Sequence, residues 1–337
     1  MKIALTMIVK NEAALLGQAL RSAKELADDI IIVDTGSTDR TVEIAKRHGA
    51  QVFEHPWEDS FSIARNQAFE HARELEPDWF FILDADEEMY REDIPRLKEL
   101  MRDEQWVAMR LINVNVFKNG NEAHHHNVRA VRNMKGVKYT GRAHNYLHCP
   151  KGKVLNTDIR IRHYGYDLTP EYMQEKYIRS AALMAQDAKE YPFDARIQYH
   201  TALMFDKMGV PEKGEPHALA AIRIWGNDTK RNMLRLLPCL HLTSAIYLKL
   251  NKHKAAERYC RRALSLWPEF ADSLFVLGML LAERPGKERE AVKHLNRYIR
   301  MDAFLRQNPQ PGYSFQCLGH AAKAVGLITM CNQRMAA

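Results

Sequence analysis

The sequence has few cysteines and no long hydrophobic run. Its five cysteines are far apart in the chain and never occur in a CxxC spacing. We therefore expect free thiols in a reducing, cytoplasmic environment and not a disulfide scaffold. No apolar stretch reaches the roughly 18 residues that a membrane-spanning helix needs. The opening residues lack a small-residue cleavage site and are interrupted by Lys10, Asn11 and Glu12, so we interpret them as a strand and not as a signal peptide.

The composition excludes several classes of protein. Apolar residues make up 46% of the 337 residues and charged residues 27%, which is typical of a globular chain and excludes a disordered tail or a collagen-like fibre. At roughly 150 residues per domain, this length predicts about two domains.

Charge is distributed unevenly along the chain. Residues 1–104 hold 13 basic and 23 acidic residues, whereas residues 105–165 hold 11 basic and 2 acidic ones. This asymmetry favours an anionic ligand held near a carboxylate-bound cation. The alternative is that the basic residues only solvate strand edges.

The first hundred residues alternate between apolar runs and helical patterns. Strands are predicted at 3–9, 29–34, 51–54 and 79–83, and helices at 12–23, from the cap Ser37 or Thr38 to Gly49, and at 61–73. This order predicts an α/β, doubly wound parallel sheet. Ligands bind such sheets beyond the carboxyl ends of the strands, which indicates residues 10–12, 34–37 and 84–88.

The remaining sequence predicts two further kinds of structure. Residues 105–165 alternate in short segments around the turn Asn119-Gly120, so we expect a mostly antiparallel extension of the sheet. From Pro170 onward the pattern is helical. A repeat of about 34 residues is visible there, similar to the tetratricopeptide pattern. Its copies contain Tyr247, Ala256, Ala263 and Pro268, then Leu274, Leu277, Gly278, Ala291 and Leu295, with a looser copy at 199–205, Ala218 and Ala221. The alternative is a plain helical bundle with alanines at its contacts.

Two acidic segments carry the main chemical signals. In LDADEE, residues 83–88, Asp84 and Asp86 are two residues apart after a predicted strand, so both can face one Mg²⁺ or Mn²⁺ that bridges a diphosphate. In VDTGSTDRT, residues 33–41, Asp34 ends an apolar strand, where it can bind a ribose or a base. A capped βα turn explains the glycine and serine of that segment but not Asp34.

Together, MIVKNE at 7–12, VDTGSTDRT at 33–41, FSIARN at 61–66 and LDADEE at 83–88 resemble the family 2 glycosyltransferases of GT-A fold. The likeness continues into 131–147 and into HYGY at 163–166. It is closest to the bacterial subgroup with tetratricopeptide-like C-terminal helices, which includes the bacteriocin S-glycosyltransferases. We therefore expect a GT-A domain over residues 1–168 and a tetratricopeptide-like helical domain over 169–337.

The resemblance implies transfer of a sugar, with inversion, from a nucleoside diphosphate donor that is usually UDP-linked. It implies a divalent metal, Mn²⁺ or Mg²⁺, and a peptide, protein or glycan acceptor, and the helical domain offers a surface for homo-oligomerisation. The implied donor-binding residues are Val9, Lys10, Asn11, Glu12, Asp34, Thr35, Gly36, Arg65, Asn66, Asp84 and Ala85. The implied metal-binding residues are Asp84, Asp86 and His163, and the catalytic candidates are Asp86, Glu87 and His144.

At the position where the subgroup pattern has a candidate general base, this sequence differs. The segment GRAHNYL commonly reads GxxHE, but Asn145 occupies the glutamate position and cannot accept a proton. His144 is the nearest titratable substitute, and Glu87 or Glu88 are the alternatives. A thiol acceptor needs less help, because thiolates form near neutral pH.

The run His124-His125-His126 invites a metal interpretation. Neighbouring residues of a strand point to opposite faces, so three in a row do not converge on one ion. We predict a polar loop, or alternatively a mobile lid formed with residues 119–122.

Two other functions compete with protein or glycan glycosylation. The basic residues Arg129, Arg132, Lys135, Lys138 and Arg142 suit a nucleic-acid acceptor, although no nucleic-acid-binding motif is present. A non-catalytic repeat scaffold with a decayed donor site is the other alternative, and Asn145 alone favours it.

Overall fold

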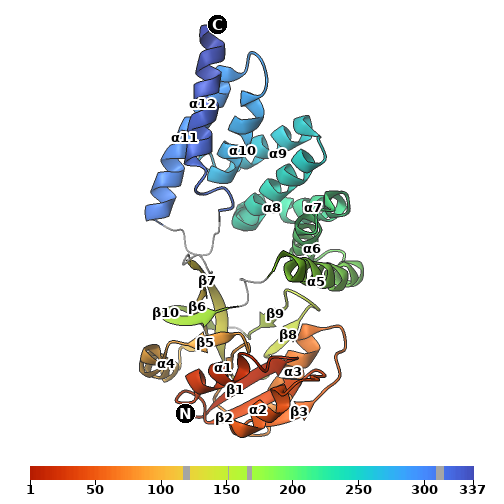
Figure 1. The fold of residues 1–337 in the computed structure, drawn as a ribbon, viewed down its shortest axis with the longest axis vertical. Helices are drawn as coiled ribbons and strands as arrows, with labels where there is room; N and C mark the ends of the chain where they lie inside the picture. The colour runs from red at the N-terminus through yellow and green to blue at the C-terminus, as the bar shows by residue number, and fades with distance from the viewer. Residues whose placement is uncertain (117–121, 151, 165–168, 309–314) are drawn as a thin grey trace. The chain divides into compact units, whose positions relative to one another are not determined.

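The structure is a computed structural model that describes residues 1–116, 122–150, 152–164, 169–308 and 315–337. The chain divides into two compact units, Met1–Lys176 and Tyr177–Ala337 (Figure 1). The turn predicted at Asn119-Gly120, residues 119–121 of the predicted lid, and the last two residues of HYGY lie outside the described residues. Within the described ranges, no helix is long and apolar enough to cross a membrane.

The first unit is built on an eight-stranded sheet in the order β3-β2-β1-β4-β7-β6-β10-β5. Its strands are β1 (Ile3–Val9), β2 (Asp29–Asp34), β3 (Gln51–Glu54), β4 (Trp79–Ile82), β5 (Glu87–Met89), β6 (Trp106–Val116), β7 (Glu122–Arg132) and β10 (Lys153–His163). Strands β3, β2, β1 and β4 are parallel. The extension is antiparallel at β4–β7, β7–β6 and β10–β5 and parallel at β10–β6. The predicted doubly wound sheet with a mostly antiparallel extension is confirmed.

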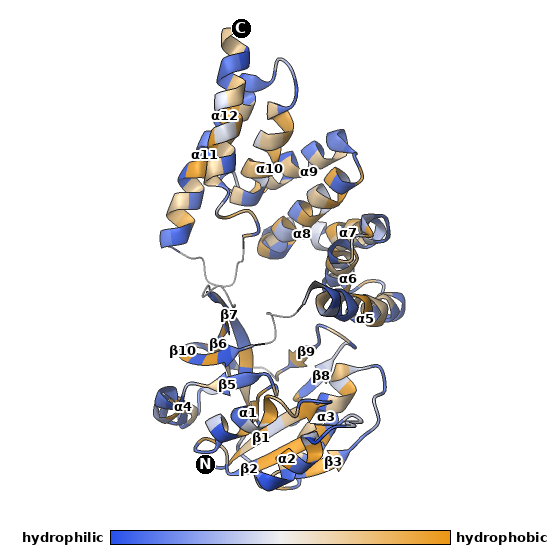
Figure 2. Ribbon diagram, viewed as in Figure 1, coloured by the Kyte–Doolittle hydropathy of each residue, from blue (hydrophilic) through white to orange (hydrophobic). Residues whose placement is uncertain are grey.

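Successive side chains of β1 point to opposite faces of the sheet, and each face packs into its own apolar core. Ile3, Leu5, Met7 and Val9 pack with helices α1 (Leu16–Ala23), α2 (Thr41–Arg47) and α4 (Ile94–Met101). On the other face, Ala4 belongs to a cluster with helix α3 (Phe61–Arg73) and the hairpin β8 (Lys138–Thr140) and β9 (Tyr146–His148). The apolar colouring of these strands is visible in Figure 2. Both faces are therefore covered, as a continuous apolar strand requires.

Two helices begin later than predicted. Helix α1 begins at Leu16 because the main-chain donors of Glu12 and Ala13 bind Thr41 and Asp39 instead of a helical turn. Helix α2 begins at Thr41, whose N–H donates to Asp39, so the predicted caps Ser37 and Thr38 are wrong.

Ser37 and Thr38 instead bind Asn11. The Asn11 N–H donates to Ser37, and the Thr38 N–H donates to the Asn11 side chain. These residues therefore tie the loop after β2 to the loop after β1, and the loop remains non-helical.

The histidine run lies in strand β7 and not in a polar loop. His124, His125 and His126 pair with Val114, Asn113 and Ile112 of β6. The long ladder with β6 extends this strand further toward the N-terminus than its sequence pattern predicts. As expected for a strand, His125 faces away from its two neighbours and the three do not converge.

The second unit is helical throughout its described residues. Its helices are α5 (Pro170–Glu190), α6 (Ala195–Lys207), α7 (Pro211–Gly226), α8 (Thr229–Lys249), α9 (His253–Leu266), α10 (Ala271–Ala282), α11 (Glu288–Gln307) and α12 (Ala321–Ala336). Pairs α6–α7, α8–α9 and α10–α11 form successive helical hairpins, which confirms the tetratricopeptide-like repeat.

Small residues of the repeat lie where helices cross. Ala218, Ala256 and Ala263 are completely buried. A Cβ atom placed on Gly278 of α10 would lie 2.6 Å from Cγ of Leu295 on α11. Glycine is thus required at this crossing for steric reasons.

We predict that Gly278→Val lowers the free energy of unfolding by about 2 kcal/mol, because the added side chain overpacks the α10–α11 contact. Urea denaturation followed by circular dichroism measures this change. Gly326→Val is the matched control, since no atom lies within 4 Å of a Cβ at this helical glycine. Equal effects of both substitutions would contradict the packing argument.

Candidate active site

Three strand ends place polar side chains at one edge of the sheet. Val9 pairs with Asp34 in the parallel β1–β2 ladder, and Asp84 and Asp86 follow β4, the other neighbour of β1. The segment after β1 contributes Glu12. Burial, and then the negative charges of Asp86 and Asp84, raise the pKa of its carboxyl group. The structure therefore brings together the three segments that the sequence singles out.

One cavity of about 350 Å³ lies beside β2. It is lined by Lys10, Asp34, Thr35, Gly36, Ser37, Val42, Glu54, His55, Pro56 and Trp57. Four of these, Lys10, Asp34, Thr35 and Gly36, are predicted donor-binding residues. The aromatic rings of His55 and Trp57 were not predicted, because they follow an exposed edge strand whose sequence carries no motif.

Asp34 presents one unused oxygen in this region. Its Oδ2 accepts the N–H groups of Gly36, at 3.1 Å, and Ser37, at 2.9 Å. Its buried Oδ1 finds no hydrogen-bond partner within the described part of the chain. A buried carboxylate oxygen without a donor is costly, so this atom is suited to accept a hydrogen bond from a ligand.

Asp86 and His163 form a second polar centre. Oδ2 of Asp86 lies 3.3 Å from Nε2 of His163, whose other ring nitrogen lies 2.8 Å from Oδ1 of Asn115. Because an amide oxygen only accepts, Nδ1 of His163 donates to Asn115, and Nε2 is the ring nitrogen that faces Asp86. Nδ2 of Asn115 lies in turn 3.2 Å from Nδ1 of His125. Asn115 and His125 thus position His163, and neither was predicted, because their partners are distant in sequence.

Two arginines hold Asp84. Arg65 donates to its Oδ1 at 2.7 Å, and Arg129 donates to its Oδ2 at 3.2 Å. Burial opposes ionisation of Asp84, but the two guanidinium groups prevail and hold its pKa well below the usual range. Asp84 is therefore a charged anchor whose two oxygens are engaged by arginines, whereas Asp86 faces His163.

Glu87 lies behind Asp84. Its side chain is only 1% exposed, contacts Arg129, and accepts from Asn113 at 2.6 Å and from the N–H of Asp84 at 3.0 Å. Burial raises the pKa of Glu87, and Arg129 opposes that shift. These contacts make Glu87 a positioning residue for Asp84, not a group that reaches substrate. Glu88 accepts from Tyr164 and Gln18.

The remaining predicted donor residues have structural partners. Both ends of the Asn66 amide bind the main chain of Tyr139. The carbonyl of Val9 accepts from the N–H and hydroxyl of Thr35, and Ala85 is buried. Arg65 faces Asp84 and a second cavity and is absent from the lining of the cavity beside β2.

The second cavity, of about 380 Å³, adjoins Asp84. It is lined by Arg65, Asp84, Arg110, His126, Asn127, Val128, Arg129, Tyr139, Asn145, Tyr146 and Leu147. The buried Nδ2 of Asn145 finds no partner in the described ranges. The preceding residue, His144, is exposed and has a φ of 45°, in the left-handed region that non-glycine residues adopt uncommonly.

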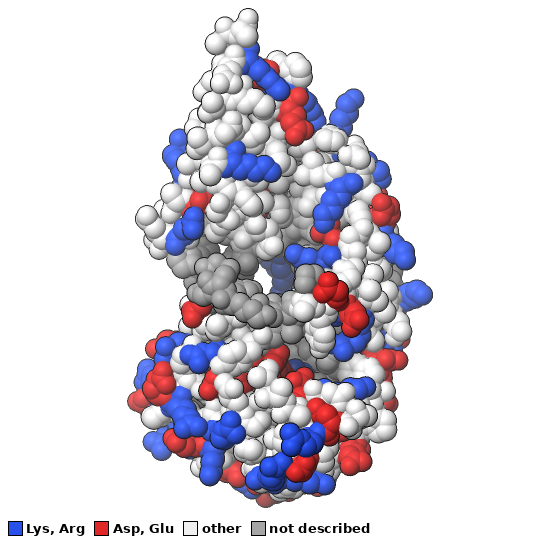
Figure 3. Space-filling model, viewed as in Figure 1, with Lys and Arg blue, Asp and Glu red and all other residues white. Residues whose placement is uncertain are grey.

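Two of the five residues of the basic stretch have partners inside the first unit. Arg129 binds Asp84 and Glu87, and Arg132 donates to the carbonyl of Trp106 and lies over the ring of Trp79. On the face shown in Figure 3, acidic and basic side chains of this unit are interspersed. Neither observation favours nucleic acid.

Residues 5–159 match the family described as Glycosyl transferase family 2. A TPR repeat-containing protein of Synechococcus elongatus is 40% identical over 111 residues, which is 33% of this chain and 27% of that protein. An uncharacterized glycosyltransferase of Rickettsia prowazekii is 41% identical over 91 residues, covering 27% of this chain and 30% of the relative.

The SPbeta prophage-derived glycosyltransferase SunS of Bacillus subtilis is 27% identical over 186 residues, which is 52% of this chain and 43% of SunS. The chain thus spans less than half the length of each of these relatives. The matches confirm the resemblance drawn from the four motifs.

The pKa of Glu12 generates a prediction about stability. Burial, followed by repulsion from Asp86 and Asp84, raises this pKa from 4.5 to about 7. The folded protein therefore binds the Glu12 proton more tightly than the unfolded chain, and this contribution to stability is lost as the pH rises from about 4.5 to 7. The free energy of unfolding of Glu12→Gln minus that of wild type should therefore increase as the pH rises from about 4.5 to 7. Below and above this interval the difference should not change with pH.

Urea denaturation in a chelating buffer between pH 4 and pH 8 measures this difference. Glu43→Gln, which changes an exposed glutamate on α2, is the control and should show no such rise. A pH-independent difference for Glu12→Gln would refute the shifted pKa.

Proposed function

We propose that the protein, whose residues 5–159 match the family described as Glycosyl transferase family 2, is a metal-dependent, inverting glycosyltransferase. It takes a sugar from a nucleoside diphosphate, UDP in the first instance, and transfers it to a peptide or protein side chain or to a glycan. The observation that carries this proposal is the placement of the unpartnered Asp34 oxygen and of Asp86 with His163 at the same sheet edge.

The cavity beside β2 is assigned to the nucleoside. The free Oδ1 of Asp34 is a suitable acceptor for a ribose hydroxyl or a base N–H. Trp57 and His55 offer ring faces of the kind on which bases stack. Lys10, at the mouth of the same cavity, supplies a positive charge toward the diphosphate side.

Asp86 and His163 fit a divalent metal. They combine a partly exposed carboxylate with an imidazole lone pair, a donor set that suits Mn²⁺ or Mg²⁺. Burial, and then the negative charges of Asp86 and Asp84, raises the pKa of Glu12 to about 7, which places a third carboxyl close to these two aspartates. A bound metal would stabilise the negative charge of the leaving diphosphate. Arg65 and Arg129 hold Asp84 beside this centre and keep the acidic segment in place.

The transfer needs an acceptor aligned with the anomeric carbon. The acceptor atom forms a bond to this carbon while the bond to the diphosphate oxygen breaks, which inverts the configuration. We assign the acceptor to the cavity adjoining Asp84, where Asn145 contributes an amide donor. A hydroxyl acceptor must lose a proton, and we retain His144, which directly precedes the cavity residue Asn145 in the chain, as the candidate base. Since Glu87 is buried, it does not serve as this base.

The first experiment is a donor screen. Purified protein with Mn²⁺ is offered UDP-glucose, UDP-N-acetylglucosamine, UDP-galactose and other nucleotide sugars, and release of the nucleoside diphosphate is followed. Metal-dependent turnover of one donor supports the proposal. A protein that neither binds nor turns over any donor would be a repeat scaffold.

We predict that Asp86→Asn lowers metal-dependent donor turnover by about 100-fold or more, because it removes the charged group that faces the metal and the leaving diphosphate. Steady-state kinetics with the active donor measure this loss. Asp158→Asn, an exposed aspartate on β10, is the control and should behave like wild type. Near wild-type turnover of Asp86→Asn would remove the metal assignment.

We predict that Asp34→Asn weakens UDP affinity by about tenfold, the loss expected for one charged hydrogen bond. The N–H groups of Gly36 and Ser37 require an acceptor, so the amide oxygen takes their place and the NH₂ group faces the ligand as a donor. Isothermal titration calorimetry measures the change. An unchanged Kd would show that Asp34 only shapes its turn.

A further inference from the structure

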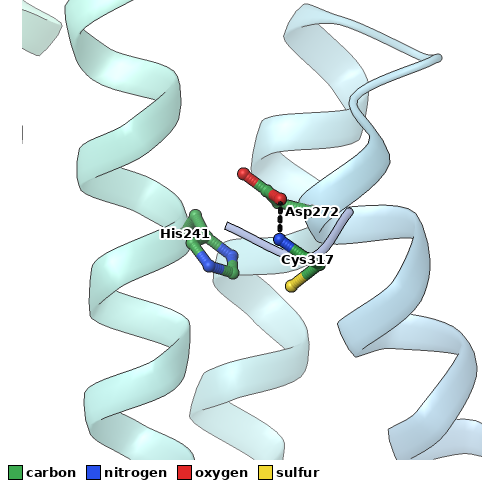
Figure 4. Close-up of side chains that lie close together, drawn as sticks. All are labelled: His241, Asp272 and Cys317. Carbon is green, nitrogen blue, oxygen red and sulfur yellow. Dashed lines mark hydrogen bonds between the residues drawn. The ribbon is translucent and has the colours of Figure 1, made fainter. Parts of the chain in front are cut away.

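The helical unit contains a buried cluster of three different metal-ligating side chains (Figure 4). His241 comes from α8, Asp272 from the start of α10, and Cys317 from the segment that precedes α12. Their ligand atoms lie within 4.8 Å of one another. The exposed fractions are only 8%, 1% and 8%. Figure 4 shows the three side chains lying close together on separate segments of the unit.

Two polar atoms of this cluster are unsatisfied. Oδ1 of Asp272 accepts the N–H groups of Gln316, at 2.9 Å, and Cys317, at 2.8 Å. The other oxygen, Oδ2, is buried and finds no partner in the part of the chain that the structure describes, and the same holds for Nδ1 of His241. Burying such atoms without a partner is costly, so the arrangement favours a ligand that satisfies both.

The protonation of the cluster suits a cation. Burial lowers the pKa of His241, which keeps the imidazole in its neutral, ligating form. Burial also raises the pKa values of Asp272 and Cys317, because an isolated negative charge is unfavourable there. A divalent cation removes this penalty, since one carboxylate and one thiolate balance its charge and leave a neutral buried complex.

We propose that His241, Asp272 and Cys317 bind a Zn²⁺ ion that stabilises the helical unit. A set of one nitrogen, one sulfur and one oxygen ligand suits zinc, whereas Mg²⁺ and Ca²⁺ prefer oxygen alone. On binding, the Cys317 thiol forms a bond from sulfur to zinc and releases its proton to solvent. The hydrogen bonds to Oδ1 orient the Asp272 carboxylate, as groups next to metal ligands commonly do. A tetrahedral zinc site would take one further donor besides these three side chains.

The site would join three segments that are distant in sequence. Zinc binds only after α8, α10 and the segment before α12 have come together, so binding stabilises the folded unit. The proposal is independent of the proposed sugar transfer, because no residue of the Asp86 centre takes part. The chemistry also separates the two sites, since the residues assigned to the Asp86 centre include no thiol.

The test is metal analysis of the full chain without a polyhistidine tag. We expect the purified protein, after exposure to zinc and dialysis, to retain about one tightly bound zinc per chain. Cys317→Ser and His241→Gln should lose it. Cys331→Ser, which changes a buried cysteine outside the cluster, and Asp86→Asn should both retain it. Chelation should lower the Tm of wild type and Cys331→Ser but not that of Cys317→Ser.

Cobalt substitution of the wild-type chain keeps the test independent of variants that fail to fold. Co²⁺ bound by Cys317 should produce a near-ultraviolet thiolate-to-cobalt band that stoichiometric Zn²⁺ removes. The absence of this band, or wild-type zinc retention no higher than that of a folded Cys317→Ser chain, would overturn the proposal. The cluster would then be a polar contact with a protonated Asp272.

Discussion

Ion pairs of Arg129 connect the parallel part of the N-terminal sheet with its mostly antiparallel extension. It projects from β7, the first antiparallel strand of the extension, and reaches Asp84 and Glu87 beyond the end of the parallel strand β4. Arg65 of α3 completes the same network from the other side of Asp84. Removing one member of such a network leaves a buried charge unpaired, a change that costs about 3–5 kcal/mol. The position of the acidic segment thus depends on contacts between elements that are far apart in the chain.

This network explains why neighbouring carboxylates have different roles. Asp84 and Glu87 are held by arginines, and Glu87 is buried, so both act as supports. Asp86 faces His163 instead and keeps a partly exposed side chain. The acidic segment therefore presents one open carboxylate on a rigid base. A similar arrangement occurs at Asp34, where one oxygen fixes the turn and the other stays available to a ligand.

In the helical unit, the contacts between crossing helices depend on small side chains. Gly278 and the buried alanines allow neighbouring helices to approach closely, and the apolar core continues from α6 to α12. His241, Asp272 and Cys317 interrupt this core with polar atoms. In tetratricopeptide-like units, stability is the sum of each repeat and its contacts with the next. A metal at this point would add a long-range connection to a fold that otherwise depends on neighbouring repeats.

Local patterns in the sequence determined the element order and the sheet edge that carries the polar segments. Apolar runs, helical spacing and the motifs at Asp34 and Asp86 are all short-range signals, and a parallel sheet necessarily gathers its strand ends on one edge. The strand and helix types were therefore predictable, and so was the family resemblance. The helix starts at Leu16 and Thr41 were not, because the main-chain donors of Glu12 and Thr41 bind side chains of the segment after β2.

Only the tertiary structure decided which polar side chains face one another. Arg129 lies 45 residues from Asp84 in the chain, and Asn115 lies 48 residues from His163. The cluster of His241 with Asp272 and Cys317 likewise unites three separate segments. No local pattern encodes such pairs, because they depend on strand order, register and helix packing. Burial then determines which oxygen or ring nitrogen remains available, and burial is a property of the folded chain.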